Sequence, residues 1–198
     1  MKTPITIAPE ALDFTQLIRA GETVGWAEAT AEPVLLTRML DAQAERCPPF
    51  RVFFALTFSQ AFAAGHANVT VTALGGASAG RRFFAGGANN VVPANISDVS
   101  SLVATGRLPI DIVLLQISGP DETGRYNAGL GIEHLHAAIG RARLVIAQIT
   151  LNCHGPTVTR RSSRRRSMYW CRLPSRRSNC RRGQQARSTG SSPITSLG

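Results

Sequence analysis

Two nearly continuous apolar runs, residues 110–117 and 144–149, constrain the fold of this chain more than any other feature. Each run is short and has few polar residues, which is typical of a β-strand buried on both faces of a sheet. Residues 134–141, between the two runs, have the apolar spacing of a helix. Because such strands alternate with helices, the sequence predicts an α/β fold with an open, mostly parallel sheet flanked by helices.

Further periodic segments precede these runs. The sequence predicts a helix at 10–20 that stops at Gly21, a strand at 23–26, a helix that begins near Pro33, and strands at 50–57 and 69–74. In parallel sheets of this class, ligands bind beyond the carboxyl ends of the strands. The loops after Gly25 and Ile117 are therefore the first candidate sites.

The charge of the chain divides it into two parts at Thr150. Of the 22 Lys and Arg residues, 11 lie in the last 48 residues, which contain none of the 12 Asp and Glu residues. The tail therefore carries +11 and residues 1–150 carry −1, which gives the net charge of +10. Residues 3–149 are long enough for one domain, whereas the Arg- and Ser-rich tail, residues 150–198, is too polar to fold alone. We expect the tail to be disordered and to add no strand to the sheet.

Few features point to a membrane, a disulfide framework or a metal. No run approaches the roughly 18 apolar residues of a membrane span, and no signal-peptide core precedes Glu10, so we expect a cytoplasmic protein with no membrane partner. Three of the four cysteines lie in the tail, in a spacing that fits neither a disulfide framework nor a compact zinc site. His66, His134 and His136 lack ligand spacing, and we expect solvated or hydrogen-bonded histidines and no metal.

Three local motifs are weak candidates for chemistry. Residues 75–87 are rich in glycine, but a phosphate-binding loop usually needs a lysine and Lys2 is the only one, so a flexible connection is the simpler interpretation. Asp121 and Glu122 form a carboxylate pair that could serve acid–base chemistry or occupy an exposed turn. Ser118 has no nucleophile-elbow sequence around it.

Three segments together are specific enough to compare with a known family. Residues 111–129 read DIVLLQISGPDETGRYNAG, residues 24–33 read VGWAEATAEP, and residues 142–149 read ARLVIAQI. This combination resembles the acetyl-CoA hydrolase/transferase family, which includes acetate and 4-hydroxybutyrate CoA-transferases. The resemblance covers about residues 3–149 and is most specific over 106–149. It implies a CoA-transferase-like N-terminal domain that is incomplete here.

The resemblance implies a longer, two-domain enzyme that moves CoA between a thioester and a carboxylic acid through a covalent glutamyl intermediate. The nucleophilic glutamate belongs to the family's second domain, so no catalytic residue is assigned in this chain, which we expect to be inactive alone. The implied partners are an acyl-CoA, as a substrate rather than a bound cofactor, and a small carboxylate; a homo-oligomer is an option for the full-length enzyme. The resemblance assigns these residues to the substrate cleft: Gly25, Glu32, Pro33, Ser118, Pro120, Asp121, Gly124 and Gly129.

The tail conceals a second pattern in a shifted reading frame. In the family, the strand at 144–149 is followed by a Pro-Gln-Leu-Pro-Trp motif and later by Ile-Asp-Val-Leu-Val. Met168 to Cys171 have constrained codons (ATG, TAY, TGG, TGY), and reading from the third letter of each gives Val-Leu-Val after a codon that can be Asp. The same frame can give Pro-Gln-Leu-Pro-Trp just after Thr150. We therefore interpret the tail as out of frame, through loss of one nucleotide near codon 150, and the chain as truncated.

The alternative interpretation takes the tail as an evolved segment. Residues 160–166 read RRSSRRR, which is typical of a nucleic-acid-binding arm because arginines neutralise phosphates. Whatever its origin, a segment with a charge of +11 is expected to bind polyanions nonspecifically. The alternative function is an α/β domain with an arginine-rich nucleic-acid-binding tail.

Overall fold

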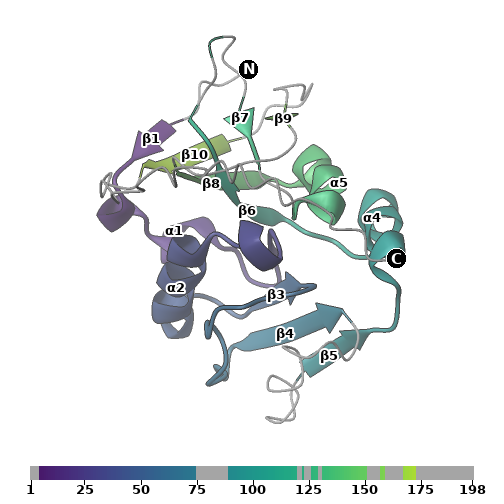
Figure 1. Cartoon of the computed structure of the whole chain (residues 1–198). Helices are drawn as coiled ribbons and strands as arrows, with labels where there is room; N and C mark the ends of the chain where they lie inside the picture. Colours follow the sequence, from purple (N-terminus) through teal and green to yellow (C-terminus); the bar gives the residue numbers. More distant parts are fainter. Residues whose placement is uncertain are drawn as a thin grey trace, which may run out of the picture.

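The computed structural model describes residues 5–74, 89–119, 122, 126–128, 131–150, 157–158 and 167–172. Within these ranges, one sheet has the strand order β1-β10-β8-β6-β2-β3-β4-β5, and each neighbouring pair is parallel (Figure 1). Its strands are β1 (Ile5–Ile7), β2 (Thr23–Trp26), β3 (Phe50–Phe54), β4 (Val69–Leu74), β5 (Asn89–Val92), β6 (Ile112–Ile117), β8 (Leu144–Ile149) and β10 (Ser167–Arg172). A separate antiparallel pair joins β7 (Tyr126–Asn127) to β9 (Thr157–Val158). The predicted open, parallel α/β fold is confirmed.

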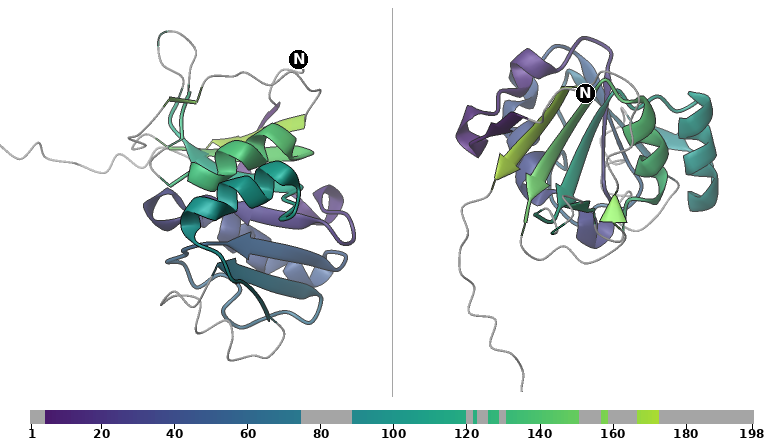
Figure 2. Two further views of the ribbon diagram at one scale, coloured as in Figure 1. Left: turned by 90° about the vertical axis from the view of Figure 1, so that its right-hand side faces the viewer. Right: turned by 90° about the horizontal axis from the view of Figure 1, so that it is seen from above.

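Helices cover both faces of the sheet (Figure 2). The helices are α1 (Phe14–Leu17), α2 (Val34–Gln43), α4 (Ile96–Thr105) and α5 (Glu133–Arg141), and the 3-10 turns are η1 (Pro9–Ala11), η2 (Ala29–Ala31) and η3 (Ala44–Arg46). In the described part of the chain no helix has the length and apolar character needed to cross a bilayer.

Alternate residues of the central strands belong to two separate cores. In β8, Leu144 and Ile146 pack with residues of α1 and α2, whereas Val145 and Ala147 pack with residues of α4 and α5. All four side chains are at most 3% exposed. Burying a Leu, Ile or Val side chain contributes about 1.5–3 kcal/mol, so the apolar runs that predicted β6 and β8 also hold the helices in place.

The helix expected at 10–20 is wrong. The segment instead forms the turn η1 and the short helix α1, because Leu12 and Ile18 have extended backbones. Both of these side chains are buried, and Asp13 caps α1 by accepting a hydrogen bond from the backbone N–H of Thr15. The apolar spacing therefore reflected two buried turns rather than one continuous helix.

The expectation that the tail adds no strand is also wrong for six of its residues. β10 lies between β1 and β8, with Tyr169 in register with both Ile5 and Ile146. Met168 to Cys171 form an apolar, β-prone segment inside a polar tail. Pairing with them satisfies the backbone groups that would otherwise be unpaired along β8. The rest of the tail, apart from Thr150 and β9, lies outside the described residues.

Candidate functional site

Three loops meet at the carboxyl edge of the sheet, where a parallel sheet normally binds its ligands. The backbone N–H of Ala29, after β2, donates to the carbonyl of Leu56, after β3, at 2.9 Å. The backbone N–H of Glu28 donates to the carbonyl of Gly131, just before α5, at 3.1 Å. These contacts join the loops after β2 and β3 to the start of α5 in one rigid edge.

Glu32 connects two of these loops from below the surface. Glu32 is 3% exposed. Its Oε2 accepts hydrogen bonds from Thr57 Oγ1 at 2.8 Å, from the N–H of Phe58 at 2.9 Å and from the N–H of Ser59 at 3.2 Å. Oε1 accepts a longer bond from Thr37 Oγ1 of α2. Both oxygens of the Glu32 carboxylate therefore accept hydrogen bonds from the protein, and these bonds fix the loop after β3.

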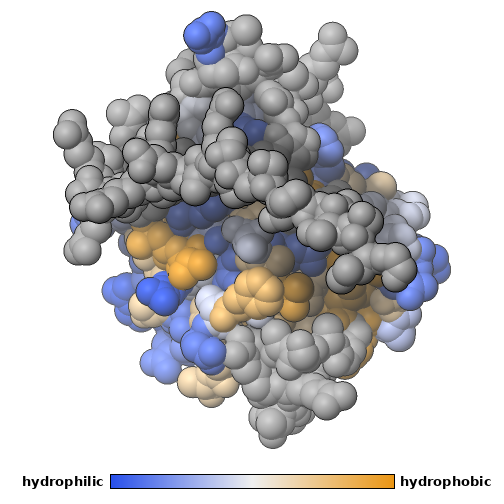
Figure 3. All heavy atoms as spheres, in the orientation of Figure 1, coloured by the Kyte–Doolittle hydropathy of each residue, from blue (hydrophilic) through white to orange (hydrophobic). Residues whose placement is uncertain are grey.

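The loop that Glu32 shapes presents an apolar side chain to solvent. Phe58 is 62% exposed, although its own N–H is held by Glu32. Val34, at the start of α2, is 37% exposed. Figure 3 shows orange, apolar residues among blue, polar ones on one face of the molecule. At the carboxyl edge, Phe58 and Val34 therefore form an apolar surface beside the backbone that Glu32 fixes.

Gly25 and Pro33, two of the expected cleft residues, are buried. A Cβ on Gly25 would lie 2.9 Å from Ile110 Cγ2, so the glycine allows β2 to pack closely against that side chain. Pro33 occupies the N-cap position of α2. Both residues shape the edge from inside the fold.

Ser118, at the end of β6, holds the turn that leads to β7. Its Oγ accepts from the N–H of Asn127 at 3.0 Å and donates to the carbonyl of Gly119 at 2.8 Å. The same two segments are joined by the Ser118 N–H, which donates to the Asn127 carbonyl at 2.7 Å. The other expected cleft residues, Pro120, Asp121, Gly124 and Gly129, lie outside the described residues, as does the glycine-rich segment 75–87.

A glutamate–histidine pair at this edge was not expected from the sequence. His134 Nδ1, in the first turn of α5, lies 3.8 Å from Glu28 Oε1, with side-chain exposures of 0% and 12%. Neither ring nitrogen of His134 has a hydrogen-bond partner among the described residues. Burial lowers the pKa of His134 from 6.5 to about 4, so the ring is neutral at pH 7. The expectation of a solvated or hydrogen-bonded His134 is therefore wrong.

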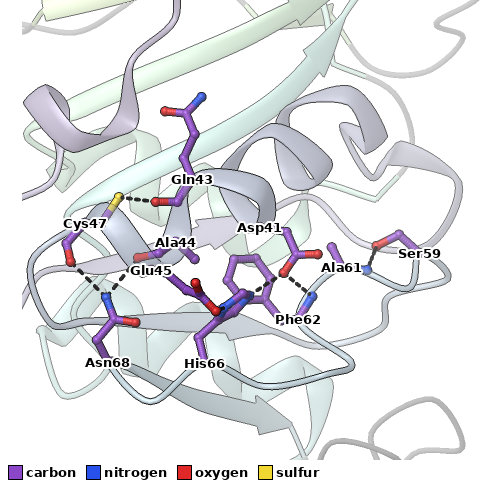
Figure 4. Close-up of polar contacts among 10 residues, drawn as sticks. All are labelled: Asp41, Gln43, Ala44, Glu45, Cys47, Ser59, Ala61, Phe62, His66 and Asn68. Carbon is purple, nitrogen blue, oxygen red and sulfur yellow. Dashed lines mark hydrogen bonds and ion pairs between the residues drawn. The ribbon is translucent and has the colours of Figure 1, made fainter.

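A second histidine–carboxylate pair lies at the opposite, amino edge of the sheet (Figure 4). Asp41 Oδ1 lies 2.8 Å from His66 Nε2 and accepts from the N–H of Phe62 at 3.0 Å. The expectation of a hydrogen-bonded His66 is confirmed. Phe62 has a φ of 63°, which is rare for a bulky residue. Across the described ranges, no three His, Cys, Asp or Glu residues are grouped in a way that could hold a metal ion.

Sequence comparison finds one family model and a curated relative for this chain. Residues 8–162 match the family model of the acetyl-CoA hydrolase/transferase N-terminal domain. A 66-residue segment is 35% identical to a 4-hydroxybutyrate coenzyme A transferase of Clostridium kluyveri and covers 33% of this chain and 15% of that protein.

Solved structures agree in fold. A 4-hydroxybutyrate CoA-transferase from Porphyromonas gingivalis has a TM-score of 0.59 at 20% identity, over 86% of this chain and 40% of that one. RipA from Yersinia pestis has a TM-score of 0.69 at 18% identity, over 86% of this chain and 43% of that one. The chain therefore spans less than half the length of these proteins.

Proposed function

The chain belongs to the acetyl-CoA hydrolase/transferase family, a family of enzymes, and we propose that it forms the first part of an enzyme that moves CoA between an acyl-CoA thioester and a short carboxylic acid. The observation that carries this proposal is the family match over residues 8–162, together with a 4-hydroxybutyrate coenzyme A transferase as a relative. The proposed substrates, a CoA thioester and a small carboxylate, are supported by the same match. The proposed location is the cytoplasm.

The 198-residue chain is proposed to be inactive alone. A glutamyl intermediate needs a carboxylate that a thioester carbonyl can reach, and Glu32 is buried and occupied by hydrogen bonds from Thr57, Phe58 and Ser59. That the chain spans 40% of one structural relative is consistent with a missing catalytic part. The proposed cleft wall comprises the loops after β2, β3 and β6. Turnover of acetyl-CoA and a carboxylic acid by the purified chain would argue against inactivity.

The basic tail is proposed to arise from loss of one nucleotide near codon 150. The constrained codons of Met168 to Cys171 support this proposal, because they encode Val-Leu-Val in the shifted frame. Resequencing from codon 140 through about a kilobase past the stop tests it: one added base should restore Pro-Gln-Leu-Pro-Trp and lead into a glutamate-bearing second domain. An intact frame with no related sequence downstream would reject it.

The charge of the tail favours polyanion binding as a second candidate function. A segment with 11 arginines and no acidic residue binds phosphates through charge alone. Filter binding to single- and double-stranded nucleic acids over a series of salt concentrations tests this function. Binding that depends steeply on salt but not on sequence indicates a nonspecific effect of the charge, whereas a preferred sequence would support an evolved role.

A further inference from the structure

Phe58 is the most exposed large apolar residue in the described part of the chain, at 62%. It lies in the loop after β3, at the carboxyl edge of the sheet, and Val34 at the start of α2 is 37% exposed. Both residues are tied to Glu32: the N–H of Phe58 donates to Oε2 at 2.9 Å, and the N–H of Val34 donates to the carbonyl at 2.9 Å. The apolar surface that these two residues form is therefore anchored to one buried residue.

The backbone at Phe58 is held in place although its side chain is exposed. Thr57 and Ser59, on either side of it, are buried at 1% and 8% exposure, and both donate to the Glu32 carboxylate. Burying a carboxylate costs free energy unless its hydrogen bonds are satisfied, and here those bonds fix the backbone of this loop. An aromatic side chain on a fixed backbone loses little freedom when it is covered, and aromatic residues are frequent anchors of protein contacts.

The length of the chain indicates what covers this surface. The chain spans 40% of the Porphyromonas gingivalis enzyme and 43% of RipA, so more than half of a relative of this kind has no counterpart here. In a parallel α/β sheet the ligand site forms at the carboxyl edge. A second part that completes a cleft at this edge has to approach the loop after β3, where Phe58 and Val34 lie.

We propose that Phe58 and Val34 anchor the contact between this domain and the second part of the enzyme, and that apolar side chains of that part cover them. This inference rests on the proposed function, which supplies the second part. Both oxygens of the Glu32 carboxylate accept hydrogen bonds from this chain. The contact at Phe58 is therefore apolar packing rather than an ion pair with Glu32.

Thiol labelling tests the contact in the 198-residue chain and in the product of the frame-restored gene. Phe58→Cys is made in both proteins, and its reaction with a thiol reagent is followed by mass spectrometry of the peptide that contains the substitution. The thiol should react fast in the 198-residue chain, where this position is exposed. It should react about tenfold more slowly or less in the restored product, because reaction there requires local opening of the contact.

Glu45→Cys is the matched control at the amino edge. The Glu45 side chain is 83% exposed, and the introduced thiol should react at the same rate in both proteins. Equal rates for Phe58→Cys in the two proteins would overturn the contact, as would a slow reaction in the 198-residue chain itself. A locus that encodes no second part would overturn it as well.

Other occupants give different results in the same experiment. A second copy would slow the reaction of the 198-residue chain as its concentration rises, and a substrate would slow that of the restored product only when CoA or 4-hydroxybutyrate is added. Either result, without protection by the second part itself, would overturn the proposal. Protection in a folded restored product that transfers no CoA rejects the proposed function and leaves the contact standing, whereas transfer without protection rejects the contact alone.

Discussion

The two edges of the sheet use the same kinds of side chain in different ways. At the amino edge, Asp41 pairs with His66, and each ion-pair partner is partly exposed, at 32% and 13%. At the carboxyl edge, Glu32 and His134 are buried, and the His134 ring nitrogens have no hydrogen-bond partner in the described chain. The Asp41–His66 pair at the amino edge is therefore an ordinary, partly exposed structural pair. At the carboxyl edge, Glu32 and His134 are polar groups whose burial costs free energy. Substitutions at the carboxyl edge should therefore change the free energy of unfolding more than substitutions at the amino edge.

The largest effect is expected from Glu32→Ala. The substitution leaves Thr57 Oγ1 and the N–H groups of Phe58 and Ser59 without their acceptor. Each unsatisfied buried group costs about 1–3 kcal/mol, so the free energy of unfolding should fall by roughly 4 kcal/mol in urea denaturation. Glu45→Gln is the control, because its side chain is 83% exposed, and it should change stability by less than about 0.5 kcal/mol. Equal effects at both positions would remove the distinction between the edges.

His134 should make the chain sensitive to mild acid. Its pKa is about 4 in the folded chain and 6.5 in the unfolded chain, so the unfolded state binds more protons between these values. Stability is then complete above about pH 6.5 and falls as the pH drops towards 4, by about 3 kcal/mol in total. Urea denaturation of the wild type and His134→Gln from pH 7 to 4 measures this, since the variant should lose less stability. Parallel curves would contradict the buried, neutral imidazole.

A smaller effect is expected for Asp41→Asn at the amino edge. The amide can accept from Phe62 or from His66 but lacks the charge of the carboxylate, so we expect a loss of about 1–2 kcal/mol. Thermal denaturation at pH 7 provides the measurement. A loss as large as that of Glu32→Ala would mean that the strained Phe62, rather than the exposure of the pair, determines the cost.

The smallest effect is expected for Glu22→Gln. Burial raises the pKa of Glu22, but hydrogen bonds from Arg143 and Arg19 and the charges of both residues outweigh it, and the net pKa is lowered. The ion pair, with Arg143 Nε 2.6 Å from Glu22 Oε1 and the arginine 33% exposed, should contribute about 1 kcal/mol at pH 7. That contribution is present above the unfolded pKa and is lost as the pH falls below it. The variant and wild type should therefore converge in acid, and a difference that persists at pH 3 would argue against the pair.

The central sheet could be predicted from the sequence because its signal is local. The strands β6 and β8 are apolar on both faces, and burial on both faces leaves a continuous apolar run. The tail strand β10 was missed because only Met168 to Cys171 are apolar and the composition of the whole tail conceals them.

The candidate site was less predictable because its contacts join distant segments. Glu32 could be named from its loop, but its partners Thr57 to Ser59 lie 25–27 residues away and two of them donate from the backbone. A hydrogen bond donated by a backbone N–H does not depend on which residue stands at that position, so the sequence does not reveal it. The burial of His134 had a detectable signal, since it shares the face of α5 that carries Leu135 and Ala138, but its proximity to Glu28 depends on how the loop after β2 folds.

The most direct test of the account compares CoA transfer by the 198-residue chain with that by the product of the frame-restored gene. Both would be assayed with acetyl-CoA and with acetate or 4-hydroxybutyrate as acceptor. We expect transfer by the restored product and none by the 198-residue chain. Transfer by the 198-residue chain, or an inactive restored product that is fully folded, would contradict the proposal that this chain is the first part of a CoA-transferring enzyme.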